Sequence, residues 1–219
     1  MRAFDIDRYK CRQLATNDPL GPGQYNDVAE LIYDTDPYIY PALFGDGPDG
    51  VKNAARILPV VFESNRDAMF AKGNLFVLSD ADEIVGLILW HKGSMKWDPQ
   101  EILAAARRES ILLYAEDVKK VSKEYVDSQY MARDENKNDT ISVINVCVKR
   151  GLRGCGAATY IMNCFIADHM KENMELTVLA DNVHAIELYK KFGFAVVRES
   201  MGFSRNNQKP RCFIMERDI

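Results

Sequence analysis

The stretch TISVINVCVKRGLRGCGAATYIM, residues 140–162, decides the fold. Its first part, residues 140–148, is rich in Val and Ile and predicts a buried strand. A basic turn with Gly154 and Gly156 follows, and the apolar residues after it predict a helix over residues 155–171. Backbone N–H groups converge at such a turn, and the start of the helix adds partial positive charge. We therefore expect a diphosphate ligand at this turn.

Two common phosphate-binding motifs do not fit the turn. A P-loop requires Gly-Lys-Ser/Thr after the glycines, and none follows here. Thr159 stands where a dinucleotide-binding fingerprint has its third glycine. Nucleoside triphosphates and dinucleotides are therefore disfavoured as ligands.

The turn resembles the central motif of the GNAT acetyltransferases, Gln/Arg-x-x-Gly-x-Gly/Ala. Arg153, Gly156 and Ala158 occupy its three defined positions. Val148 lies five residues before Arg153, as in family members, and ADNVHAIELYKKFGF at residues 180–194 resembles the second signature of the family. Together the two signatures identify the chain as similar to this family.

The resemblance covers residues 74–198 and implies the fold of the family. This fold is an α/β (α+β) structure with a mixed, mostly antiparallel sheet of six or seven strands, helices on both faces, and the cofactor between two strands that splay. The segment 98–133 predicts one or two helices inserted before the central strand. Pro37 and Pro41 disfavour a helix and predict an ordered loop over residues 34–41. Strands are predicted at 9–14, 74–79, 84–90, 140–148, 175–179, 194–199 and 211–216, and helices at 25–33, 49–63, 155–171 and 183–192.

The resemblance also implies that acetyl-CoA is the co-substrate and that main-chain groups hold it. Val148 would donate its backbone N–H to the oxyanion of the reaction. The basic cluster of Lys149, Arg150 and Arg153 is either a solvated turn or a set of charges that attracts the phosphates. The pantetheine arm would lie along Val146, Cys147 and Val148, and the diphosphate along Gly154, Cys155, Gly156, Ala157, Ala158 and Thr159.

Two side chains of the second signature carry implied roles. Asn182 would hydrogen-bond the pantetheine region, although asparagine is also a common N-cap of a helix. Tyr189 would protonate the departing thiolate, since a phenol with a pKa near 10 is protonated at neutral pH. Tyr189 also lies on the apolar face of its predicted helix, so core packing is the alternative.

The general base is not assigned by the sequence. Thr177, five residues before Asn182, stands where some family members carry Glu. A water held by Ser142 or Asn145, or a carboxylate from residues 34–36, could serve instead.

Covalent and metal-assisted routes are disfavoured. Cys155 lies near a helix N-terminus, where the pKa of a thiol falls, but family members transfer the acetyl group directly from thioester to amine. His91, His169 and His184 show no ligand-like spacing with other metal-binding residues. We therefore expect neither an acyl-cysteine nor a metal ion.

Bulk composition agrees with a single globular domain over residues 1–219. The sequence has 28 basic and 32 acidic residues and no basic block, so neither nucleic acid nor a membrane is an expected partner. Its five cysteines are scattered and contain no C-x-x-C pair, which is typical of reduced thiols. The N-terminal residues predict neither a signal peptide nor a membrane span, so the cytoplasm is the expected location.

The expected reaction is acetyl transfer from acetyl-CoA to a primary amine in a ternary complex, with a small molecule as acceptor. One alternative is an enzyme that acetylates protein N-termini or lysines, with residues 38–40 receiving the peptide. Another is a CoA-binding sensor with this fold and little turnover. The inserted helices could line the acceptor pocket, cover the sheet or form a homodimer, and their periodicity fits all three.

Overall fold

The computed structural model describes residues 4–64, 69–93, 99–113, 118–121, 123 and 139–219. Seven strands form one sheet in the order β1-β2-β3-β4-β5-β7-β6. Neighbouring strands run antiparallel except β4 and β5, which run parallel. The mostly antiparallel sheet predicted from the sequence is therefore confirmed. The strands are β1 (Tyr9–Gln13), β2 (Leu75–Asp80), β3 (Glu83–Lys92), β4 (Ile141–Val148), β5 (Met174–Leu179), β6 (Ala195–Met201) and β7 (Arg211–Arg217).

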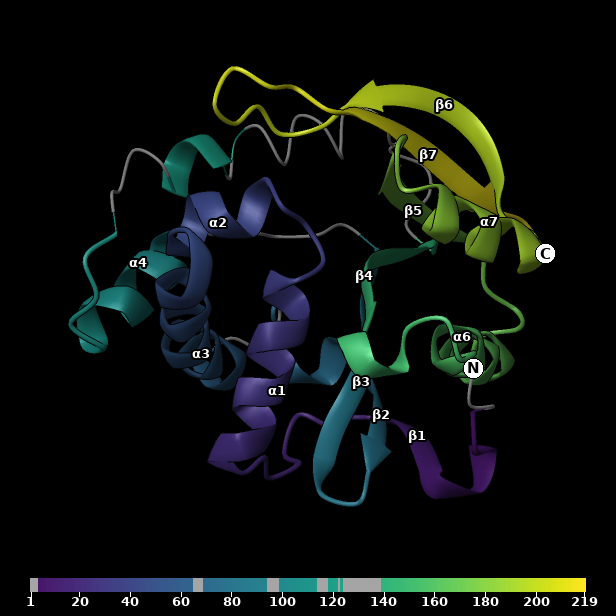
Figure 1. The fold of residues 1–219 in the computed structure, drawn as a ribbon, viewed down its shortest axis with the longest axis horizontal. Helices are drawn as coiled ribbons and strands as arrows, with labels where there is room; N and C mark the ends of the chain where they lie inside the picture. The colour runs from purple at the N-terminus through teal and green to yellow at the C-terminus, as the bar shows by residue number, and fades with distance from the viewer. Residues whose placement is uncertain (1–3, 65–68, 94–98, 114–117, 122, 124–138) are drawn as a thin grey trace.

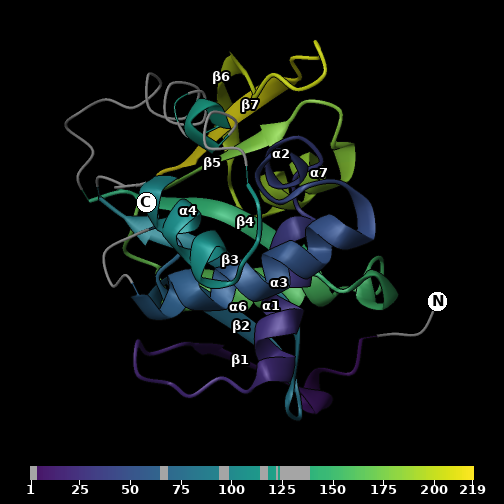
Figure 2. The ribbon, with the colours of Figure 1, turned by 90° about the vertical axis from the view of Figure 1, so that its left-hand side faces the viewer.

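Helices cover both faces of the sheet, as predicted. Figure 1 shows α1 to α4 on the left of the sheet and α6 and α7 on its right. In Figure 2, turned by 90°, helices α1, α3 and α4 lie in front of the strands. The helices are α1 (Pro22–Tyr33), α2 (Ile39–Phe44), α3 (Gly47–Ser64), α4 (Pro99–Arg108), α6 (Ala157–Asp168) and α7 (Val183–Lys191), with short 3-10 turns η1 (Ile6–Arg8), η2 (Lys72–Asn74) and η3 (Arg150–Leu152).

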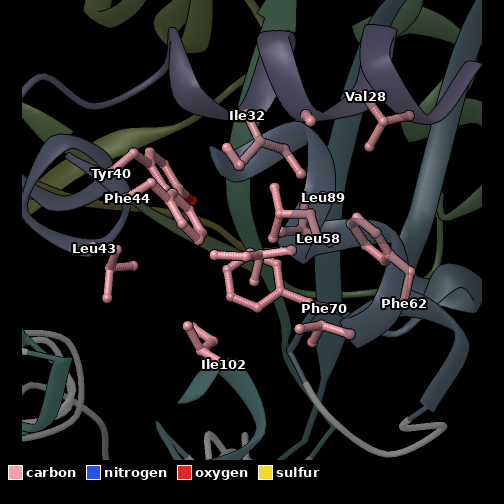
Figure 3. Close-up of a cluster of buried hydrophobic side chains, with 14 of the residues drawn as sticks. Val28, Ile32, Tyr40, Leu43, Phe44, Leu58, Phe62, Phe70, Leu89 and Ile102 are labelled. Atoms are coloured by element: carbon pink, nitrogen blue, oxygen red, sulfur yellow. The ribbon is translucent and has the colours of Figure 1, made fainter. Parts of the chain in front are cut away.

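Alternating side chains of the central strands supply a core on each face. Leu75 and Val77 of β2 pack under α1 to α4, whereas Phe76 and Leu78 pack under α6 and α7. This alternation follows from the pleat, which points successive side chains to opposite faces. Figure 3 shows the first core, where side chains of α1, α2, α3 and α4 meet Leu89 of β3.

The predicted loop over residues 34–41 is wrong in its second half, because α2 begins at Ile39. The carboxylate of Asp36 accepts hydrogen bonds from the backbone N–H groups of Tyr38 (2.7 Å) and Ile39 (2.8 Å). Pro41 falls in the first turn of the helix, where its missing N–H has no intrahelical acceptor to lose. The prolines therefore permit this short helix.

The described part of the inserted segment contains two helical stretches, and residues 109–113 between them lie outside a helix. Helix α4 covers Pro99–Arg108, and residues 118–121 are also helical. Ile102 and Val118 are buried in the core beneath α1 to α4. The rest of the predicted insertion, up to residue 133, falls largely outside the described residues. The described part of the insertion packs over the core, which fits the role of covering the sheet among the three roles considered.

Candidate active site

Strands β4 and β5 separate after a short parallel ladder. Their pairing covers only Ile141–Val143 on β4, which match Met174–Leu176 on β5. On the other side of β4 the register shifts at this same point: Leu89 pairs with Asn145 and Trp90 with Val143. Ile144 is thus an extra residue, and such a bulge bends the strand that contains it. The bulge explains why the remainder of β4 leaves β5.

The separation leaves main-chain groups of β4 without a neighbouring strand. Gly86 and Val148 are cross-strand partners, and the N–H of Lys149 bonds the carbonyl of Val85 at 2.8 Å. Gly86 and Val148 are therefore a non-hydrogen-bonded pair, so the N–H and C=O of Val148 point away from β3. The same alternation applies to Val146. Both residues direct main-chain groups toward the side that β5 has left.

The glycine turn leads from this opening into α6. Gly154 has a φ of +75° and Gly156 a φ of +108°, backbone conformations that side chains with a Cβ rarely adopt. Gly154, Gly156 and Thr159 are exposed, whereas Ala157 is buried and anchors the helix. The first N–H groups of α6 have no intrahelical acceptor. The turn thus has the geometry of an anion site, and the predicted diphosphate contacts stay a prediction.

The basic cluster beside the turn is paired with carboxylates. Arg153 and Arg150 both bond Asp34, the latter at 2.7 Å, and Arg153 also donates to the carbonyl of Val148 at 3.3 Å. Lys149 bonds Asp27 at 2.6 Å. Burial alone would raise the pKa of Asp34, but its hydrogen bonds to the two arginines lower it below the usual range. The Arg153 side chain thereby ties the turn to the C-terminal end of α1, and its predicted phosphate contact is untested.

Two cysteines lie at the predicted cofactor site. The thiol of Cys155 donates to the carbonyl of Leu152 at 2.9 Å, within the turn itself. Cys147 is buried, and this burial raises the pKa of its thiol to about 11. Cys147 therefore remains a neutral thiol near neutral pH, and the hydrogen bond of Cys155 gives its thiol a structural role.

A pocket of about 130 Å³ lies where β4 and β5 separate. It is enclosed by the loop between α1 and α2, the bulged part of β4, the end of β5, the start of α7 and the segment between β6 and β7. Three predicted site residues, Val146, Asn182 and Tyr189, line it together. The fold therefore brings β4, the strand before the first motif, and the second signature to one place. The predicted diphosphate residues 154–159 do not line this pocket.

Tyr189 is both a packed residue and a pocket residue. Only 8% of it is exposed, and its ring lies 6.0 Å from that of Phe194. Burial, and secondarily the neighbouring Cys147, raises the pKa of the Tyr189 phenol. Among the described residues, no hydrogen bond partner of its hydroxyl is found, so this group is available to a ligand. Packing and proton donation are compatible, and the second stays a prediction.

Asn182 is the N-cap of α7. Its side-chain oxygen accepts the backbone N–H of Ala185 at 3.2 Å. The N-cap role that the sequence offered as the alternative for Asn182 is therefore confirmed. Capping uses the oxygen only, so the amide NH₂ group at the pocket stays compatible with the predicted cofactor contact.

A buried hydrogen-bond chain that sequence reasoning missed forms the pocket wall opposite α7. The hydroxyl of Tyr40 donates to the Asn145 side-chain oxygen at 2.9 Å, and the Asn145 amide donates to Thr35 at 2.6 Å. Burial raises the pKa of Tyr40. This chain fixes α2 against β4 at the bulge.

The structure gives the candidates for the general base different surroundings. Ser142 bonds Glu175 at 3.2 Å within the β4–β5 ladder, and the Asn145 side chain is committed to the wall just described. Asp34 is paired with arginines, whereas Asp36 lines the pocket. Thr177 lines the pocket too.

Comparisons with known proteins identify the family of the chain. Residues 54–194 match the Acetyltransferase (GNAT) family, and the chain belongs to this family. A search of curated proteins gives no match. Among solved structures, an N-acetyltransferase from Staphylococcus aureus Mu50 is 16% identical, with 94% of this chain and 99% of that chain covered and a TM-score of 0.57.

Two further structures share the fold at low identity. The histone acetyltransferase HPA2 and related acetyltransferase from Corynebacterium glutamicum is 21% identical, with 90% and 89% covered and a TM-score of 0.56. The NatC complex bound to Gag peptide and CoA is 12% identical, with 97% and 99% covered and a TM-score of 0.52. At these identities the likeness concerns the fold.

The described residues contain no group of three His, Cys, Asp or Glu side chains that could hold a metal ion. Within the same part of the chain, every helix is too short or too polar to span a bilayer.

Proposed function

We propose that the chain transfers the acetyl group of acetyl-CoA to a primary amine by direct attack in a ternary complex. The opening between β4 and β5 is the observation that supports this proposal most directly. There the main-chain groups of Val146 and Val148 face away from β3, and Tyr189 lines the same pocket as Val146. An extended pantetheine arm could pair with β4 as a neighbouring strand would. It would lead from a diphosphate at the glycine turn to a thioester beside Tyr189.

The proposed reaction follows from these positions. The amine nitrogen attacks the thioester carbon, the C–N bond forms, and the N–H of Val148 stabilises the oxyanion. The C–S bond then breaks, and the Tyr189 hydroxyl donates its proton to the leaving thiolate. Burial keeps Tyr189 protonated at neutral pH by raising its pKa, so it donates late, as charge develops on sulfur. The surplus proton on nitrogen restores the phenol.

A small-molecule acceptor is supported by the size of the pocket, about 130 Å³. A peptide acceptor is the second candidate, because a larger depression of about 410 Å³ lies beyond Phe203, which lines both spaces. It runs between α2, the described residues 118–121 of the insertion and residues 203–206. The NatC complex, which shares the fold, is bound to both the Gag peptide and CoA, and this supports the alternative.

The test is release of free CoA thiol from acetyl-CoA in the presence of amines, amino acids, polyamines, aminoglycosides and short peptides. We expect turnover with at least one primary amine and mass-spectrometric detection of its N-acetyl product. Tight binding of CoA with no turnover on any acceptor would contradict acetyl transfer and favour the sensor. Higher kcat/KM on peptides than on all small amines would select the peptide alternative.

A further inference from the structure

We infer that the acceptor enters the pocket as an ammonium ion, and that the carboxylate of Asp36 binds this ion and takes its proton. This inference rests on the proposed function and assigns the general base that the family signatures leave open. It also defines the substrate class as primary amines that are cationic at neutral pH.

The position of Asp36 is the first support. Asp36 lies in the loop between α1 and α2 and lines the same small pocket as Asn145 and Tyr189. One of its carboxylate oxygens is fixed by the backbone N–H groups of Tyr38 and Ile39, at 2.7 and 2.8 Å. This fixed orientation leaves the second oxygen for another partner. A carboxylate held rigidly beside the proposed thioester is well placed to orient an amine.

The charge around Asp36 is the second support. Among the described residues, no Lys or Arg forms an ion pair with Asp36, whereas Asp34, two positions earlier, is paired with both Arg150 and Arg153. A partly buried carboxylate without a cation is costly, and a cationic ligand would offset this cost. The contrast between two neighbouring aspartates therefore points to a ligand that supplies the positive charge.

Two weak acids interact electrostatically with Asp36: the phenol of Tyr40 and the thiol of Cys212 on β7. The phenol of Tyr189 on α7 lines the same pocket. Burial raises the pKa of Cys212 to about 11 and also raises the pKa values of Tyr40 and Tyr189. Burial raises the pKa of Asp36 too, against its two backbone hydrogen bonds. Asp36 is thus the group of this set that can exchange a proton under mild conditions.

The proposed reaction moves one proton through Asp36 and one through Tyr189. The ammonium gives one proton to Asp36 and becomes a neutral amine, which attacks the thioester. Tyr189 gives a proton to the thiolate and recovers one from the nitrogen of the tetrahedral intermediate. Asp36 finally releases its proton to solvent. The products are the amide, free CoA and one proton, and no other reactant is needed.

The decisive variant is Asp36→Asn. Asparagine keeps a side-chain oxygen that can accept the N–H groups of Tyr38 and Ile39, so the start of α2 is preserved. It removes only the charge and the basicity. Asp181→Asn is the matched control, because Asp181 is exposed in the turn before α7 and does not line the pocket.

The probes are propylamine, phenethylamine and the uncharged phenethyl alcohol, chosen because Tyr38, Ile39 and Phe203 give the pocket apolar and aromatic walls. With an amine that turns over, wild-type kcat/KM should be level from about pH 6 to about pH 8, because the pair of Asp36 and amine holds one proton throughout. In Asp36→Asn, kcat/KM should be about 100-fold lower near neutral pH and rise about tenfold per pH unit toward the pKa of the amine. The CoA affinity should be unchanged.

Calorimetry of the protein saturated with CoA tests the inference independently of turnover. The two ammonium probes should bind wild type and the Asp181→Asn control at least about tenfold more tightly than Asp36→Asn, while the alcohol binds all three alike. Equal binding of an ammonium probe to wild type and Asp36→Asn, or no binding to wild type, would overturn the inference. An equal pH profile in both proteins would do the same. Ammonium binding that depends on Asp36, without turnover on any acceptor, would reject acetyl transfer while the binding role of Asp36 stands.

Discussion

The two sides of the opening between β4 and β5 are built from different kinds of atoms. On the side proposed for the cofactor, the end of β4, the glycine turn and the start of α6 present mainly main-chain groups from one continuous segment. On the side proposed for the acceptor, side chains come from segments far apart, such as Asp36, Asn145 and Tyr189. A main-chain site depends on backbone conformation and tolerates many side chains. A side-chain site changes whenever one of its residues changes, so specificity can diverge there while cofactor binding is kept.

The largest expected effect tests the residue where the two sides meet. Tyr189→Phe removes the hydroxyl that would protonate the thiolate and keeps the ring that packs on Phe194. We expect kcat to fall by about 10² to 10⁴, with the Kd for CoA unchanged. Steady-state kinetics and CoA titration measure this, and Tyr160→Phe on the partly exposed α6 position serves as control. Wild-type turnover in Tyr189→Phe would leave Tyr189 with packing alone.

The second-largest effect is expected at the glycine turn, on the side proposed for the cofactor. Gly156→Val forces a β-branched residue into a left-handed conformation, which costs about 1–2 kcal/mol or reshapes the turn. We expect CoA to bind at least about tenfold more weakly. Gly151→Ala is the control, since Gly151 has no such φ and a Cβ there meets nothing within 4 Å. CoA affinity equal in both variants would show that the turn does not hold the cofactor.

A smaller effect is expected at the hydrogen bond between Tyr40 and Asn145, on the side proposed for the acceptor. Tyr40→Phe leaves the side-chain oxygen of Asn145 without its donor in a buried site, which lowers the free energy of unfolding by about 1–3 kcal/mol. Denaturant unfolding measures the loss. Tyr38→Phe, on the same helix start but less buried, should change it little. Equal losses would mean that the hydrogen bond is not what fixes α2 to β4.

The smallest effect is expected at Asp34, whose ion pairs with Arg150 and Arg153 connect the end of α1 with the glycine turn. Because the arginines lower its pKa, the ion pairs stabilise the fold fully above the ordinary aspartate pKa of about 3.9, and this contribution disappears as the pH falls through the lowered folded-state pKa. Asp34→Asn should therefore cost about 1 kcal/mol at neutral pH and progressively less in acid. Unfolding curves of both proteins across pH test this, and a difference independent of pH would contradict it.

The same contrast explains what the sequence could predict. The strand, the glycine turn and the second signature are local patterns, so the sheet, the helices on both faces and the family follow from one sequence. Helix α2 was missed although Asp36 followed by Pro37, a capping residue before proline, is a known signal of a helix start. The pair of Tyr40 and Asn145 is separated by 105 positions, and no local pattern brings two such residues together.

The short ladder between β4 and β5 has a thermodynamic consequence. Only three residue pairs join the two parts of the sheet there, and in the proposed complex acetyl-CoA would fill the seam beyond them. A ligand that binds only the native state adds about 2.7 kcal/mol at a free concentration of one hundred times its Kd. The melting temperature of the protein would then follow the supply of the acyl donor, and starvation for that donor would shorten the lifetime of the folded chain.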